Sequence, residues 1–69
     1  MDNVLIEFGK RVRSLRKLAS LSIEELSFRS GLNRNYISDV ERGTRNISLK
    51  AINQIAEGLN VPIEALFIH

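Results

Sequence analysis

The stretch LSIEELSFRSGLNRNYISDVERG, residues 21–43, decides the fold of this chain. Its pattern predicts two short helices, over residues 23–30 and 34–42, with a tight turn between them. Gly31 falls where the first helix has to end, because glycine adopts positive φ angles without a steric penalty from a Cβ atom. Leu32, which is apolar in an otherwise polar turn, is expected to fill the angle between the two helices.

Both helices are preceded by residues that suit a helix amino end. Ser22 and Asn33 are N-cap residues, whose side chains accept a hydrogen bond from an otherwise unpaired backbone N–H. Glu25, three residues after Ser22, completes a capping box. Two capped helices joined by a glycine turn are typical of a helix-turn-helix. This pattern alone fits a DNA reader and a plain helical hairpin equally well.

The second helix favours the DNA reader. Ile37 and Val40 lie three residues apart and can face the core together. What remains at the front of this helix is polar: Arg34, Asn35, Ser38 and Asp39. Arginine and asparagine side chains match the major-groove edges of guanine and adenine, so these four residues are the candidates for base contact. The alternative is an ordinary solvated helix face.

The motif L-S-x-E-E-L-[small]-x-x-[small]-G-L-x-R-x-Y-I-S-x-x-E-R-G resembles the Xre-type, lambda-repressor-like helix-turn-helix, and the likeness covers nearly the whole chain. Within that family, the chain is similar to the small controller proteins of restriction–modification systems, through Arg34-Asn35-Tyr36-Ile37-Ser38, Glu41-Arg42-Gly43 and Arg45-Asn46. Ile23 is a departure, because the family usually has a glutamine there that can contact the DNA backbone. We expect Ile23 to pack as a hydrophobic staple instead.

The resemblance implies a compact all-α, five-helix domain that contacts the DNA backbone beside the bases. The residues expected to make these backbone contacts are Asn33, Tyr36, Arg42, Arg45 and Asn46. Arg45 and Asn46 lie in the loop that family members lay along the backbone, and Arg45 could also reach a base. Arg42 fits a structural ion pair with Glu41 nearly as well as it fits a phosphate.

Length and composition agree with one small domain, residues 1–69. A chain of 69 residues buries only about 60% of its unfolded surface, and oligomerisation is one remedy for such marginal stability. The formal net charge is only +2, but residues 1–17 and 29–50 each carry five basic and two acidic groups. Two locally basic regions suit contact with phosphate, although an ordinary solvated surface would have a similar charge.

The rest of the chain predicts three more helices, over about residues 3–19, 48–58 and 62–68. Phe28 and Leu49 are expected to be buried. Gly9 lies inside the first helix, where glycine is less favourable for helix stability than alanine. A close approach of another helix would explain why glycine is used there. The last helix is strongly apolar, and by resemblance it forms the dimer interface through three residues: Leu66, Phe67 and Ile68. The alternative is that these residues only complete the core of one protomer.

Features of an enzyme are lacking in the sequence. There is no cysteine, the only histidine is the terminal His69, and no metal-ligand spacing or glycine-rich phosphate loop occurs. We therefore expect no catalytic residues, metal, cofactor or small-molecule ligand. The sequence also has no apolar run long enough to span a membrane, so a cytoplasmic protein without membrane contact is expected.

The sequence thus predicts a homodimeric transcriptional regulator that binds a palindromic operator on double-stranded DNA. By resemblance it is a restriction–modification controller that regulates its own operon, and Glu24 is a candidate contact for RNA polymerase. Two alternatives remain open. One is a phage-type or plasmid-type repressor with the same DNA chemistry, and the other is an antitoxin-like protein-interaction module.

Overall fold

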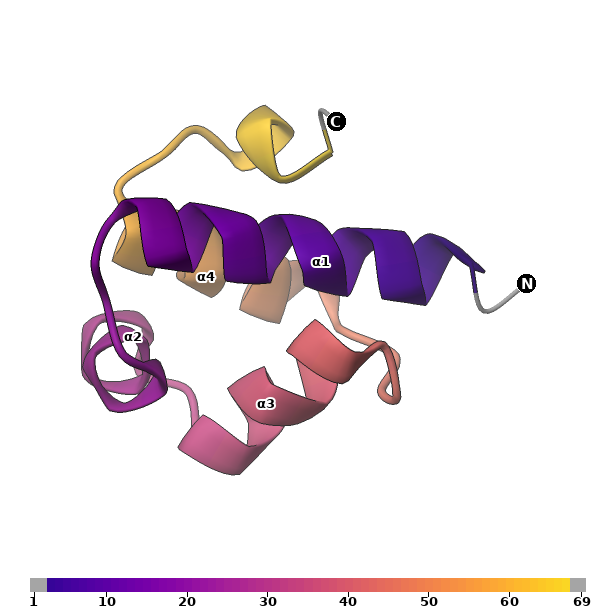
Figure 1. Ribbon diagram of the computed structural model, residues 1–69, viewed down its shortest axis with the longest axis horizontal. Coiled ribbons are helices and arrows are strands. Elements are labelled where there is room, and N and C mark those ends of the chain that lie inside the picture. Colours follow the sequence, from indigo (N-terminus) through magenta and orange to yellow (C-terminus); the bar gives the residue numbers. More distant parts are fainter. Residues whose placement is uncertain (1–2, 68–69) are drawn as a thin grey trace.

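The computed structural model describes residues 3–67, and all of its regular structure in that range is helical (Figure 1). Residues 3–67 form four α-helices and a 3₁₀-helix: α1 (Asn3–Leu18), α2 (Ile23–Ser30), α3 (Arg34–Arg42), α4 (Leu49–Leu59) and η1 (Ile63–Phe67). The all-α class is confirmed. None of the helices in the described range has the length and apolar character needed to cross a bilayer.

The prediction of five α-helices was wrong for the last one. The segment after Pro62 is a five-residue 3₁₀-helix, in which the N–H of Ala65 donates to the carbonyl of Pro62 at 2.9 Å. Five residues are too few to repay the cost of starting an α-helix, and such short pieces commonly adopt the tighter 3₁₀ form. Arg11 of α1 holds this segment in place, because its Nε donates to the carbonyl of Ala65 at 2.9 Å.

Helix α1 runs through the middle of the molecule. In Figure 1 it separates η1 on one side from α2 and α3 on the other, with α4 behind it. Helix α1 packs mainly on α3, and α2 packs mainly on α4. The arrangement leaves one side of α3 facing away from the other helices.

The predicted caps of the two central helices are confirmed. The Ser22 hydroxyl accepts from the N–H of Glu25 at 3.0 Å, and the Glu25 carboxylate accepts from the N–H of Ser22 at 2.7 Å. The Asn33 side chain accepts from the N–H of Asn35 at 2.7 Å. Gly31 has a φ angle of +74°, the left-handed conformation that ends α2. These local bonds fix where α2 begins and ends and where α3 begins.

The core is a single apolar cluster to which every helix contributes. Its members are Phe8, Val12, Leu21, Leu26, Ile37, Val40, Ile55, Ala56, Leu59 and Leu66. Two residues that were predicted to be buried are exposed. Phe28 is 90% exposed because it lies two residues after the buried Leu26, which places it on the opposite side of α2. Leu49 is 74% exposed because it begins α4, whose buried positions start at Ala51.

Helices α1 and α3 cross at Gly9. A Cβ atom at this position would lie 2.3 Å from the carbonyl oxygen of Val40, much closer than any real contact. The expected close approach at Gly9 is therefore confirmed, and the partner is the backbone of α3. Glycine at this point lets α1 support the back of α3.

Candidate nucleic-acid interface

Helix α3 is buried on one side and polar on the other. Ile37 and Val40 are 0% and 2% exposed, and they anchor the helix in the core. Arg34 and Asn35 are exposed on the outer side, and Ser38 and Asp39 are partly exposed. The structure therefore brings the four predicted base-contacting residues together on the accessible part of α3.

A buried ion pair fixes the carboxyl end of α3, and the sequence reading missed it. Arg16 of α1 donates from Nε and Nη2 to the two carboxylate oxygens of Glu41, at 2.7 and 3.0 Å, and from Nη1 to the carbonyl of Leu21 at 2.9 Å. Hydrogen bonding to Glu41 raises the pKa of Arg16, against the lowering effect of burial. Arg16 lies four residues after the buried Val12, and this position on the apolar stripe was the available signal.

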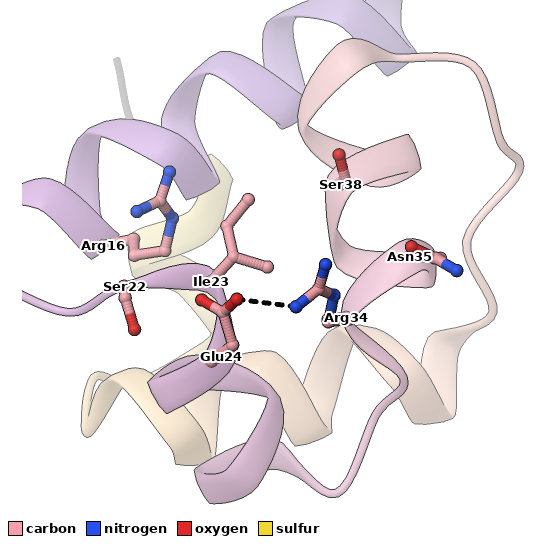
Figure 2. Close-up of a pocket in the computed structure, with 7 residues that line it drawn as sticks. All are labelled: Arg16, Ser22, Ile23, Glu24, Arg34, Asn35 and Ser38. Atoms are coloured by element: carbon pink, nitrogen blue, oxygen red, sulfur yellow. Dashed lines mark hydrogen bonds and ion pairs between the residues drawn. The ribbon is translucent and has the colours of Figure 1, made fainter.

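A hollow of about 370 Å³ lies between the amino ends of α2 and α3 (Figure 2). Figure 2 shows Glu24 of α2 facing Arg34 of α3, and their ion pair is 2.7 Å long with about 63% and 62% of each side chain exposed. Ile23 lies beside them and packs, partly buried, against the core, as expected for an apolar residue, but as the first residue of α2 it does not have the position before the N-cap that a staple requires. At the position where the family usually has glutamine, this chain thus has an apolar side chain that lines the hollow.

A second cluster joins α3 to the loop after it. Asp39 pairs with Arg42 through one carboxylate oxygen and with Arg45 through the other, the latter at 3.3 Å. Arg42 also donates to the hydroxyl of Ser38 at 2.9 Å. Of the two alternatives for Arg42, the structure shows a structural ion pair, but with Asp39 and not with Glu41, which is bound to Arg16. Arg42 is part of the exposed surface.

The predicted backbone-contacting residues lie around the same surface. The guanidinium of Arg45 lies over the ring of Tyr36, with its central carbon 4.7 Å from the ring centre. Asn33 and Asn46 are both exposed, and the side-chain oxygen of Asn33 is already used in capping α3. Gly43 has a φ angle of +73° and ends α3, which turns the loop back alongside the helix. The arrangement offers several cations and amides on one side of the molecule.

The residues predicted to form a dimer interface differ in their accessibility. Leu66 is completely buried in the protomer core, so we reassign it from a dimer contact to a core residue. Phe67 is 54% exposed, and its ring centre lies 5.4 Å from that of Phe8. Ile68 lies outside the described residues. Phe67 and Val4, which is 69% exposed, border a small hollow between α1 and η1.

Comparison with known families gives a match to the helix-turn-helix model over residues 12–66. This range contains α2, the turn, α3 and α4 in full. It begins within α1 and ends within η1, so the match extends over most of the described fold.

Several similar proteins are controllers of restriction–modification systems. The control protein C.BamHI of Bacillus amyloliquefaciens is 46% identical over 61 residues, covering 87% of this chain and 75% of the relative. The crystal structure of the controller protein C.AhdI from Aeromonas hydrophila superposes with a TM-score of 0.92 at 46% identity, covering 94% of this chain and 98% of that one. The controller protein C.Esp1396I, solved as a tetramer with its natural 35-base-pair operator, gives 0.85 at 32% identity, covering 91% and 83%.

Proposed function

The chain belongs to the helix-turn-helix family, and on this basis we propose that it is a homodimeric DNA-binding regulator of transcription. Its role is that of a restriction–modification controller, which binds a palindromic operator and tunes its own operon. C.Esp1396I, a similar controller, has been solved as a tetramer on its operator. A protein that acts on DNA in this way works in the bacterial cytoplasm.

One observation carries the proposal: the outer side of α3 presents Arg34 and Asn35 at its amino end, while Ile37 and Val40 hold its inner side in the core. The amino-terminal residues of the second motif helix are those that reach base edges in a major groove. Arg34 suits the two acceptors of guanine, and Asn35 suits the acceptor and donor of adenine. Ser38, one turn later, adds a hydroxyl that reaches the same base edges, while the carboxylate of Asp39 beside it is bound to Arg42 and Arg45.

Contacts to phosphate hold α3 in register on the duplex. Arg42 and Arg45 supply the cations, and Asn33, Asn46 and the hydroxyl of Tyr36 supply hydrogen-bond donors. These contacts carry little sequence information, but they provide most of the affinity and make it depend on salt. Arg45 lies on the Tyr36 ring, so it approaches the duplex with its orientation already restricted.

The second protomer is proposed to bind at the surface made by Phe67 and the neighbouring part of α1. Phe67 is an exposed aromatic residue next to the exposed Val4, and a chain of 69 residues gains stability from burying such a surface. A two-fold dimer then presents two copies of α3 to half-sites about one helical turn, ~34 Å, apart.

Glu24 is proposed as a contact for RNA polymerase when the bound regulator activates transcription. Its side chain is 63% exposed at the start of α2, and it is paired with Arg34. Replacing Glu24 could therefore affect both activation and DNA binding. Transcription has to be compared with operator occupancy measured on the same Glu24→Ala variant, and activation lost at full occupancy supports the polymerase contact.

Selection from a random duplex library tests the proposed function. We expect enrichment of a palindrome whose half-sites are centred about 10 base pairs apart, with binding that weakens steeply as salt is raised. Recovery of sequences with no shared half-site would overturn the proposal. A protein-interaction module with no DNA role would give that second result.

A further inference from the structure

Asp39 is the centre of the cation cluster at the end of α3. Its two carboxylate oxygens bind different arginines, Arg42 of the same helix and Arg45 of the following loop. The side chain of Asp39 is 27% exposed, whereas those of Arg42 and Arg45 are 60% and 47% exposed. The side chain of Asp39 is therefore less accessible to solvent than the two arginine side chains that it binds.

The position of Asp39 is unfavourable for α3 taken alone. It lies in the last turn of the helix, where the dipole repels a carboxylate and attracts a cation. Capping does not require its side chain either, because Thr44 bonds to the backbone carbonyl of Asp39, with its N–H at 3.0 Å and its hydroxyl at 3.1 Å. In the described part of the chain, the carboxylate thus makes hydrogen bonds and ion pairs only with the two arginines.

We propose that Asp39 is a specificity-determining residue that acts through Arg42 and Arg45, by restraining their attraction for DNA of any sequence. This inference rests on the proposed function. The three groups together carry a net charge of +1, although the two arginines alone would carry +2. A phosphate that approaches either guanidinium has to compete with a carboxylate already bound there.

The pairing of Asp39 with the two arginines lowers the affinity for random DNA more than the affinity for the operator. Attraction to phosphates supplies essentially all of non-specific binding, whereas an operator complex also gains from base contacts. In the operator register, α3 is held at one position where Arg42 and Arg45 meet phosphates while still paired with Asp39. A non-specific complex has no fixed register, so a guanidinium has to leave Asp39 to follow a phosphate. The carboxylate therefore weakens the non-specific complex by the larger factor. Specificity is the ratio of the two affinities, so Asp39 raises it even where it lowers both.

The experiment compares wild type with Asp39→Asn, which keeps the size of the side chain and removes its charge. Dissociation constants are measured by fluorescence anisotropy on the selected duplex and on a scrambled duplex of equal length, over a series of salt concentrations. Asp39→Glu keeps the charge, and Asp39→Ser is a second neutral variant in case Asp39→Asn does not fold. Glu57→Gln on α4 is the control for a change of one charge elsewhere.

We expect Asp39→Asn to bind the scrambled duplex about threefold to tenfold more tightly and to steepen its salt dependence by up to about one phosphate contact. Binding to the selected duplex should change less, so the ratio of affinities falls. Asp39→Ser should behave in the same way, while Asp39→Glu and Glu57→Gln keep the wild-type ratio. With Arg42→Ala and Arg45→Ala both present, adding Asp39→Asn should no longer tighten non-specific binding.

Two results would overturn the inference without affecting the proposed function. The first is a wild-type protein that prefers the selected duplex and an Asp39→Asn variant with the same ratio of affinities. The second is a variant that loses affinity only for the selected duplex, which would make Asp39 a direct base contact. If the wild type itself does not distinguish the two duplexes, the proposed function has failed as well.

Discussion

Arg16 and Glu41 form a two-pronged ion pair inside the protein, with N···O distances of 2.7 and 3.0 Å. The pair joins α1 to the last turn of α3, close to where Gly9 lets the two helices touch. Both side chains are almost fully buried, at 10% and 4% exposed. Helix α3, which carries the proposed DNA-binding surface, is therefore held in place by a buried ion pair as well as by apolar packing.

Removing one partner of this pair should destabilise the fold strongly. Arg16→Met leaves the carboxylate of Glu41 buried without its cation, and we expect a loss of about 3–5 kcal/mol in the free energy of unfolding. The double variant Arg16→Met with Glu41→Leu should recover much of that loss, because neither charge then remains buried. Urea unfolding of the three proteins measures this. A single variant as stable as wild type would contradict the structural role of the pair.

Gly9→Ala should destabilise the protein even though alanine favours a helix. The added Cβ would meet the backbone of Val40 at 2.3 Å, and we expect a loss of about 1–3 kcal/mol. Gly58→Ala is the comparison, because its Cβ would lie 3.0 Å from the end of the Leu26 side chain and 3.2 Å from the nearest backbone atom, the nitrogen of Ser30, which are milder contacts than 2.3 Å. The melting temperature of Gly9→Ala should therefore be lower than that of Gly58→Ala. The reverse order would show that α1 and α3 are less close than described.

The capping box of α2 should make stability depend on pH in the acid range. Hydrogen bonds from Ser22, that of its backbone N–H first, lower the pKa of Glu25. A lowered pKa in the folded state means that the contribution is present above the ordinary glutamate pKa, about 4.3, and is lost as pH falls through the lowered value. Melting temperatures of wild type and Glu25→Gln, measured from pH 7 to pH 2.5, should converge at low pH. Curves that stay parallel would argue against the contribution of Glu25.

Arg34→Ala should weaken operator binding by about 1–3 kcal/mol and relax selectivity at one base position. Its effect on folding should be small, because the lost pair with Glu24 is exposed. Lys10→Ala removes an equal charge from an exposed position on α1 and serves as the control. Anisotropy titrations against single-base variants of the selected site measure both effects. Uniform weakening at every position would mean that Arg34 contacts only phosphate.

Phe67→Asp should convert the dimer to a monomer without unfolding the protomer. Phe67 is 54% exposed, so a carboxylate there stays in water in the monomer but would be buried at the proposed interface. Phe28→Asp is the control, since Phe28 is an exposed aromatic on α2, away from that surface. Sedimentation velocity should show monomers for Phe67→Asp and dimers for Phe28→Asp. If both variants sediment as dimers, the dimer interface lies on another surface of the protomer.

Local signals in the sequence predicted much of this fold. The bounds of α2 and α3 were recovered because Ser22, Gly31 and Asn33 act within a few residues of their own positions. Errors arose where the outcome depends on which elements pack together. Phe28 is apolar, but the side of α2 that faces the core is set by Leu26, so hydrophobicity alone misplaced Phe28.

The sequence predicted which polar residues lie on this surface, but not which carboxylates bind its arginines. The motif identified Arg34, Arg42 and Arg45, and the structure presents all three at the surface. Their carboxylate partners are set by rotamers and by the path of the loop after Gly43, which sequence spacing does not reveal. The spacing of Arg42 from Asp39 is helical, but the contact of Arg45 with Asp39 depends on the turn between them.

The measurement that tests the central claim most directly is the stoichiometry and reaction order of binding to the selected duplex. Native mass spectrometry gives the number of protomers bound, and occupancy as a function of total protein gives the order. A dimer that places two copies of α3 predicts two protomers per palindrome and occupancy that rises with the square of protomer concentration below the dimer dissociation constant. A single bound protomer, with occupancy first order in protein at every concentration, would contradict the account.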